Sequence, residues 1–496
     1  MTQDIETPTG IQRLVASPTV RSGYTSAVVH MLALIGLALF WIDGREPPRP
    51  RPIVIALSAA PESDESGAAA AEAIMPGAPA SDAQPVVPLA TADPEPIPAP
   101  EPVADVPVPL VPMETVMPVA AKSDGIVARP ASLTRAAPPA GPAGDPLATA
   151  FARRSGADRG AAVRDRGGSA ASEAAVERGL AWLARHQAAD GSWRFDLSGC
   201  RCDGGCRDAG TVSSTTAATG IALLPFLGAG HTQAAGAYRE TVTRGLYYLM
   251  SRLQPTPRGG DLAEGTMYGQ GVATLALAEA LGMTKDDMLV RPVRDAVRFI
   301  VTAQDAHGGG WRYLPGQAGD TTVTAWQVAA LKSAALAGIE VPSPTFDGVC
   351  RFLDRVASPD GESYGYTGPQ AGQSCTSAIG LLCRMYTGWD REAALDRGLA
   401  ALAKPGPAPQ NVYQNFYLAQ ALLQRDHPAW PRWNARNRDL LVAAQARIGH
   451  EEGSWSFADP DTSSGGRLGH TALAVLTLEV YYRLLPIYGE AAVGGF

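Results

Sequence analysis

An internal repeat limits the fold of this sequence more than any other feature. Arg-Gly-Leu or related helix starts recur along the chain, with middle residues at Gly179, Gly245, Ala296, Gly348, Gly398 and Asp439. The intervals between them are 66, 51, 52, 50 and 41 residues. A period near fifty residues accommodates two helices and two loops, so the sequence predicts a series of helix pairs.

The expected helices form two sets that alternate along the chain. One set is amphipathic and rich in charge, and is expected at residues 171–188, 236–254, 288–304, 344–357, 391–403 and 433–446. The other set consists mostly of apolar residues, Ala, Gly and Thr, and is expected at residues 211–229, 267–282, 320–337, 373–387, 411–425 and 468–486. A helix that is apolar on every side must be buried on every side, so the second set should lie inside the first. Two concentric rings satisfy this pattern, and so does an open helical solenoid.

A second motif follows several helices of the amphipathic set, namely a Gln and then Gly-x-Trp. The copies are Gln187 with Gly191-Ser192-Trp193, Gln304 with Gly309-Gly310-Trp311, and Gln445 with Gly453-Ser454-Trp455; residues 361–364 form a degenerate copy. The glycines permit a tight turn. The Trp can pack against the neighbouring repeat, and the Gln side chain can bond the backbone of the turn.

These copies resemble the Gln-Trp repeats of the squalene–hopene cyclase and protein prenyltransferase superfamily. The first copy is nearly complete from Arg178 to Trp193, and the resemblance covers about residues 170–490. It implies an all-α fold, an (α/α)6 toroid of six helix pairs with a central cavity, over residues 169–490. It is much less specific about activity.

Cyclases of that superfamily protonate a polyene from an Asp-x-Asp-Asp motif, whose acid needs flanking carboxylates and a dry pocket. The nearest segment here contains only Asp320; Gln317 and Gly319 stand at the other two acidic positions. Ordinary cyclase chemistry is therefore expected to be absent. Asp320 keeps two interpretations, a catalytic acid near the cavity or an N-cap that accepts from the backbone of Thr322 or Val323.

Protein prenyltransferases bind zinc through an Asp, a Cys two residues later and a His on a later inner helix. His470 begins the last inner helix and resembles that His, but no Asp-x-Cys stands in the preceding repeats where it is needed. The zinc triad is not supported, and His470 is expected at the cavity rim.

Three of the six cysteines, Cys200, Cys202 and Cys206, lie within seven residues. Outside the cytoplasm a disulfide is the default for such a loop, and it would leave one Cys unpaired. A zinc site is one alternative, but it needs a fourth ligand that the sequence does not identify. Three free thiols are the other alternative. The other cysteines, Cys350, Cys375 and Cys383, fall within helices and are expected to act as small hydrophobic residues.

The N-terminal ends of the inner helices should form the mouth of the cavity. The candidate ligand-binding residues there are Thr215, Tyr268, Gln270, Thr324, Trp326, Gln373, Tyr413, Gln414, Tyr417 and His470. This aromatic and hydroxyl lining suits an elongated, lipid-like ligand with a polar end, or a sugar. The same residues can instead pack or cap helices. No cofactor motif is recognised.

The N-terminal third predicts an anchor and a tether. Residues 24–42 contain no Asp, Glu, Lys or Arg, and 19 residues at about 1.5 Å each roughly span a bilayer core. A transmembrane helix is expected there after a short cytoplasmic segment (1–23), with a cleaved signal peptide as the rival interpretation. Residues 43–168 are expected to be a disordered Pro/Ala-rich linker, because 23 of the 41 prolines lie between Pro47 and Pro146.

Within the expected span, Ser26 and His30 share one helix face. The Ser-x-x-x-His pair and the following Pro-rich linker resemble the TonB family, which implies coupling to a proton-driven membrane motor and a periplasmic head. Nothing at the C-terminus resembles the receptor-binding domain of TonB. The basic residues beside the span lean weakly against an external head. The expected location is nevertheless the inner membrane, with the C-terminal domain extracytoplasmic.

Composition and motifs together favour a membrane-anchored toroid that binds an apolar ligand or a protein partner. A formal charge of −8 argues against a nucleic-acid partner. One alternative is a diverged cyclase-like or lyase-like enzyme that uses Asp320. Another is a TonB-like coupling protein.

Overall fold

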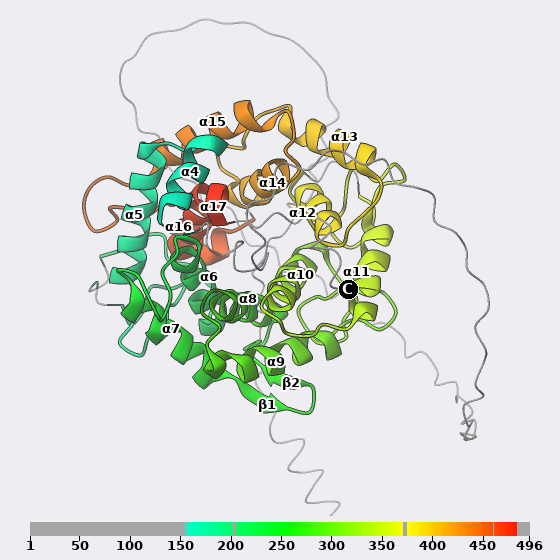
Figure 1. Cartoon of the computed structure of the whole chain (residues 1–496), viewed down its shortest axis with the longest axis horizontal. Helices are drawn as coiled ribbons and strands as arrows, with labels where there is room; N and C mark the ends of the chain where they lie inside the picture. The colour runs from blue at the N-terminus through cyan, green and yellow to red at the C-terminus, as the bar shows by residue number, and fades with distance from the viewer. Residues whose placement is uncertain are drawn as a thin grey trace, which may run out of the picture. The chain divides into compact units, whose positions relative to one another are not determined.

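The structure is a computed structural model that describes residues 154, 156–200, 202, 205–370, 374–459 and 461–483. Within these residues, six amphipathic helices surround six apolar ones (Figure 1). The outer helices are α5 (Ala170–Arg185), α7 (Arg239–Arg252), α9 (Asp287–Thr302), α11 (Ser343–Val356), α13 (Glu392–Ala403) and α15 (Trp430–Ala444). The inner helices are α6 (Thr215–Gly228), α8 (Met267–Thr284), α10 (Thr321–Leu336), α12 (Ser374–Tyr386), α14 (Val412–Gln424) and α16 (Gly466–Leu478).

The inner helices form a closed ring. Each packs against the next along the chain, and α16 packs against both α14 and α6. In the outer ring, α15 contacts α5, so the last repeat meets the first. The prediction of an (α/α)6 toroid is confirmed, and the open solenoid is excluded.

The Gln side chains of the repeated motif join neighbouring repeats, and the Trp side chains bond the outer helix of their own repeat. Gln187 Nε2 donates to the Gly191 carbonyl (2.9 Å) in its own turn and to the Thr241 carbonyl (3.0 Å) in the next outer helix. Gln304 and Gln445 make the same two bonds, to Gly309 and Thr345 and to Gly453 and Ala175. Each motif Trp indole donates to a carbonyl of its own outer helix, at Leu183, Ile300 and Leu441 respectively. We call this arrangement the Gln clamp; because Ala175 lies in α5, its third copy spans the seam between the last and first repeats.

The helix boundaries differ from the expected ones by a few residues, for local reasons. The first inner helix begins at Thr215 because Ser214 adopts an extended backbone and its side chain accepts from the Ala217 N–H. The last expected inner helix is divided into α16 and the short α17 (Val480–Arg483). A short antiparallel hairpin, β1 (Gln254–Thr256) and β2 (Gly259–Asp261), stands between α7 and α8, where the sequence analysis expected only a loop.

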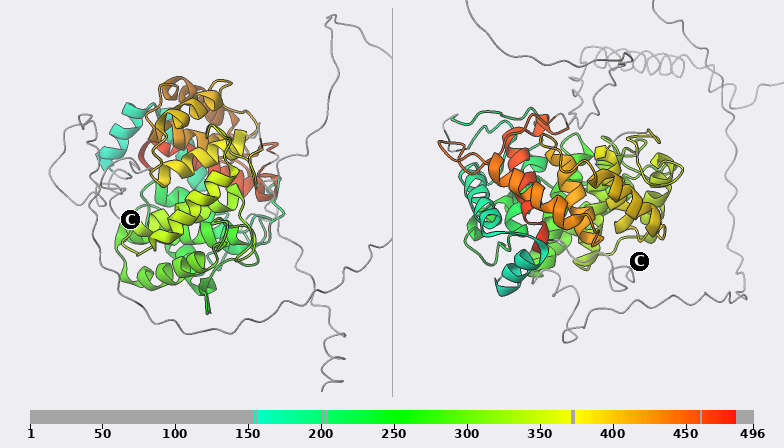
Figure 2. Two further views of the ribbon diagram at one scale, coloured as in Figure 1. Left: turned by 90° about the vertical axis from the view of Figure 1, so that its right-hand side faces the viewer. Right: turned by 90° about the horizontal axis from the view of Figure 1, so that it is seen from above.

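The end of the expected linker is helical, which corrects its boundary at residue 168. Helix α4 (Gly156–Arg166) packs against α17 at one end of the toroid (Figure 2). Its Arg159 pairs with Glu173 (2.9 Å), donates to the Ala229 carbonyl and lies 4.5 Å from the Tyr482 ring centroid. Polar contacts of this kind leave no apolar periodicity, so the sequence pattern did not reveal the helix.

Among the described residues, no helix is long and apolar enough to cross a bilayer. The expected span at residues 24–42, including Ser26 and His30, lies outside the part of the chain that the structure describes.

Candidate functional site: an apolar cavity and a Cys/His cluster

An apolar cavity opens at the end of the toroid where the inner helices begin. It encloses about 490 Å³, including the part open to solvent. It is lined by Phe195, Ala217, Ile221, Tyr268, Val272, Trp326, Tyr413, Thr462, Gly465, Gly469 and Leu473. None of these side chains is charged, so the lining of the cavity is apolar.

Aromatic side chains form the floor of this cavity. The Trp326 indole donates to the Tyr413 hydroxyl (2.9 Å) and stacks on Phe416 with ring centroids 6.1 Å apart. Trp326 also lines a second recess on the other side of the floor, together with the charged side chains of Glu279 and Lys332. The aromatic floor thus separates an apolar cavity from a charged one.

Asp320 is the N-cap of α10. One carboxylate oxygen accepts from the Val323 N–H and from the Thr322 hydroxyl, both at 2.8 Å. Its other oxygen lies 3.7 Å from Arg312 Nε. Asp320 is fully buried, and burial raises the pKa of its carboxyl above the ordinary value. It does not line the apolar cavity; its hydrogen-bond partner Thr322 bonds the hydroxyl of Tyr268, which does line it.

Two further acids at this end of the toroid also bind helix N-termini. Glu264 accepts from the Thr215 N–H (2.6 Å) and the Thr216 N–H (3.0 Å) at the start of α6. Asp459 is buried and accepts from the Val412 N–H (2.9 Å) at the start of α14. These carboxylates complement the positive ends of the helix dipoles. Like Asp320, neither lines the cavity.

Of the predicted ligand-binding residues, Tyr268, Trp326 and Tyr413 line the apolar cavity. Tyr417 lines the charged recess instead. Gln373 lies outside the described residues.

The other predicted residues bond to nearby protein groups and do not line the cavity. Thr215 bonds Glu264 and the Tyr248 hydroxyl, whereas Thr324 accepts from the Trp311 N–H. Gln270 accepts from the Leu262 N–H and donates to the Gly260 and Ala296 carbonyls. The backbone N–H of Gln414 donates to the Asn411 side chain, and His470 accepts from the Phe457 N–H. Polar residues at helix starts therefore bond other protein groups more often than they line the cavity.

The sequence analysis missed the apolar part of the lining. The pairs Ala217 and Ile221, Tyr268 and Val272, and Gly469 and Leu473 each stand four residues apart on an inner helix. This i, i+4 spacing marks the face that looks into the cavity. The signal was present, but every face of these helices is apolar, so it did not stand out.

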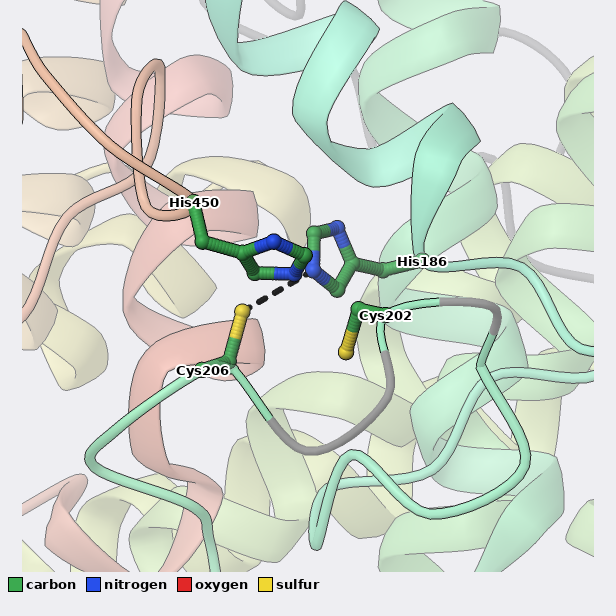
Figure 3. A group of neighbouring side chains, drawn as sticks. All are labelled: His186, Cys202, Cys206 and His450. Carbon is green, nitrogen blue, oxygen red and sulfur yellow. Dashed lines mark hydrogen bonds between the residues drawn. The ribbon is translucent and has the colours of Figure 1, made fainter.

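A cluster of metal-binding side chains lies at the seam of the toroid. His186 is the C-cap of α5, Cys202 and Cys206 lie in the loop that follows, and His450 lies in the loop after α15 (Figure 3). One donor atom from each lies within 4.8 Å of all the others. Neither His was predicted, because only ring closure brings residue 450 beside residue 186.

All six cysteines are free thiols, so the structure lacks the expected disulfide. Cys200 Sγ lies 2.6 Å from Cys202 Sγ but is not part of the four-residue cluster. Burial raises the pKa of the Cys206 thiol to about 12, helped by the neighbouring Cys202.

The His186 imidazole has a fixed orientation. Its Nδ1 lies 2.7 Å from the Trp182 carbonyl oxygen, which can only accept, so Nδ1 carries the proton. The ring stacks on the Trp182 indole (3.9 Å), and burial lowers its pKa to about 4. Neutral His186 therefore presents the lone pair of Nε2 toward Cys206 Sγ, 2.9 Å away.

Comparison with known proteins gives structural matches at low sequence identity. No protein-family model matches the sequence, and no curated protein matches it. An inactive variant of an α-1,6-mannanase from Salegentibacter sp. HEL1_6, in complex with α-1,6-mannotriose, is 10% identical, with a TM-score of 0.44 over 63% of this chain and 99% of that chain. A type II terpene cyclase from Scytonema, in complex with geranylgeranyl dihydroxybenzoate, is 12% identical, with a TM-score of 0.42 over 63% of this chain and 97% of that chain. Similarity at this level does not indicate an activity.

Proposed function

We propose that the toroid binds an elongated apolar ligand, such as an acyl or prenyl chain, in the cavity above Trp326. The observation that carries this proposal is the uncharged lining, with aromatic and aliphatic side chains around a closed floor. Such a site takes up apolar surface that water would otherwise hydrate.

The positions of the acids argue against a proton-donating cyclase. An acid that protonates a polyene must face the substrate in the cavity. Asp320 instead bonds Val323 and Thr322, and only the Tyr268 phenol stands between Thr322 and the cavity. Burial raises the pKa of Tyr268 well above its ordinary value, so this phenol is too weak an acid to protonate an alkene.

The expected anchor and linker complete the proposal. A span at residues 24–42 would place the toroid close to a membrane, the natural source of acyl and prenyl chains. The extracytoplasmic orientation, and motor coupling through Ser26 and His30, belong to the same proposal and rest on the sequence alone.

The cavity can be tested at Gly469, in the first turns of α16. A Cβ added at Gly469 would meet only Phe195, at 3.8 Å, so the backbone tolerates a side chain there. Gly469→Leu should fill the cavity and weaken binding of dansyl-undecanoic acid by roughly tenfold or more, a loss of about 1.4 kcal/mol. Gly469→Ala is the matched control and should bind nearly as well as wild type. The measurement is dansyl fluorescence on titration of the full-length chain; failure of the wild type to bind the probe, or equal binding by the Leu variant, would argue against the proposal.

A second experiment separates binding from catalysis. Asp320→Asn keeps an oxygen that can cap α10, so the variant should fold and bind the probe as wild type does. Conversion of an added polyprenoid by the wild type, lost in Asp320→Asn, would instead establish the enzyme alternative.

A further inference from the structure

We propose that His186, Cys202, Cys206 and His450 bind one zinc ion that fastens the first repeat of the toroid to the last. This inference is independent of the ligand cavity. It rests on the ligand set, on the orientation of His186 and on the position of the cluster at the seam.

The ligand set suits zinc. Two thiolates and two imidazoles form a tetrahedral structural site, with ligand distances of about 2.3 Å to sulfur and 2.0–2.1 Å to nitrogen. In such a site the ligand atoms lie roughly 3.3–3.8 Å from one another. The four donor atoms here already lie within 4.8 Å of one another, so small inward movements of the ligands complete the site.

The surroundings hold the ligands in place. The bond from His186 Nδ1 to the Trp182 carbonyl is the outer-shell contact that typically orients a zinc-bound His and leaves Nε2 free for the metal. Next to the cluster, Arg207 pairs with Glu451 (2.7 Å), and Arg467 pairs with Asp208. These ion pairs join the loop that carries the cysteines to the loop of His450 and to α16.

The position of the cluster gives the ion its role. His186 and His450 are distant in sequence, and the Gln clamp of Gln445 crosses the same seam. A crosslink that closes so long a loop restricts the unfolded chain strongly. Four protein ligands leave no open position for a substrate, so the proposed zinc is structural. A surface recess lined by His186, Cys202 and His450 provides the entry path.

The competing arrangement is a disulfide between Cys200 and Cys202, whose sulfur atoms lie 2.6 Å apart. It would remove Cys202 from the metal site. Cys200 itself is outside the ligand set and so offers a matched control in the same loop.

The test measures zinc in the full-length chain, purified without chelator, by inductively coupled plasma mass spectrometry. Wild type and Cys200→Ser should each retain about one zinc per chain. The zinc affinity of Cys206→Ser and that of His450→Asn should each fall by roughly tenfold or more. His450 is exposed, so its variant should fold even if Cys206→Ser does not.

Cobalt substitution gives a second readout. Cobalt in the wild type should show the visible bands of a tetrahedral site and a thiolate-to-cobalt charge-transfer band, which weakens in Cys206→Ser but not in Cys200→Ser. The proposal is overturned if the wild type takes up no zinc after reduction and reconstitution. Zinc retained at full affinity by His450→Asn, or a Cys200–Cys202 disulfide found in the purified native chain, would also overturn it.

Discussion

The pKa of Lys332 is lowered by the position of this residue in the toroid. It lies on the inner helix α10, is 3% exposed and lines the charged recess below the aromatic floor. Burial disfavours the charged ammonium and lowers its pKa from 10.5 to about 8. The two cavities therefore differ in chemistry as well as in position.

The lowered pKa predicts a pH-dependent stability. Between about pH 8 and 10.5 the folded chain has released the Lys332 proton while the unfolded chain still holds it, so unfolding takes up a proton. The contribution of Lys332 to the free energy of unfolding should therefore rise with pH across this window and stay constant below it. Urea unfolding of wild type and Lys332→Met at pH 7 and pH 9.5 measures it. The exposed Lys404→Met is the control, and a difference between wild type and Lys332→Met that does not change with pH would contradict the prediction.

At the scale of the helices, the Gln clamp explains why the Gln and Gly-x-Trp motif recurs along the chain. Each Gln amide donates to two carbonyls, one in its own turn and one in the next outer helix. A buried carbonyl that loses its donor costs about 1–3 kcal/mol, so the clamp favours one register between neighbouring repeats.

The clamp predicts a large loss of stability in Gln445→Ala. Gln445 is 2% exposed, and its removal takes the donor from the Gly453 and Ala175 carbonyls. The free energy of unfolding should fall by about 2–3 kcal/mol. Gln254→Ala, at an exposed position, should change it by less than about 0.5 kcal/mol. Urea unfolding measures both; equal stability of the two variants would refute the clamp.

The sequence predicted the local features of the fold better than the long-range ones. The helices and Gln-Trp turns were predictable because periodicity and turn residues act within one repeat. The aromatic floor was partly predictable, since Trp326 and Tyr413 lie near helix starts. The pairing of His186 with His450 was not, because it depends on where the ring closes. Helix α4 was missed because Arg159 holds it by polar contacts that have no periodic signature.

At the scale of the whole toroid, a buried ion cluster joins the two ends of the described chain. Glu279 on α8 bonds Arg154 (2.8 Å) before the first helix and Arg483 (2.7 Å) at the end of α17. All three side chains are at most 6% exposed. The apolar cavity lies at the N-terminal ends of the inner helices, whereas Glu279 lies near the C-terminus of α8. The ion cluster is therefore at the opposite end of the inner helices from the cavity.

This cluster predicts that Glu279→Gln is strongly destabilising. The substitution removes a charge partner from two buried guanidinium groups, which typically costs about 3–5 kcal/mol. Glu177, which is 54% exposed and lies 3.5 Å from Arg159, is the control; Glu177→Gln should cost about 0–1 kcal/mol. Denaturant unfolding at neutral pH compares them. A loss below about 1 kcal/mol for Glu279→Gln would show that the buried pairs contribute little.

The Arg154 side chain also donates to the main-chain oxygen of Arg483, at 3.1 Å. The first and last described residues of the toroid thus lie within reach of one side chain. A mechanical pull between these two ends would load the contact between Arg154 and Arg483 before it loads the hydrogen bonds between repeats. It also follows that the two ends can be joined by a short linker and the chain reopened in the hairpin turn between β1 and β2, giving a circularly permuted protein with the same repeat-to-repeat contacts.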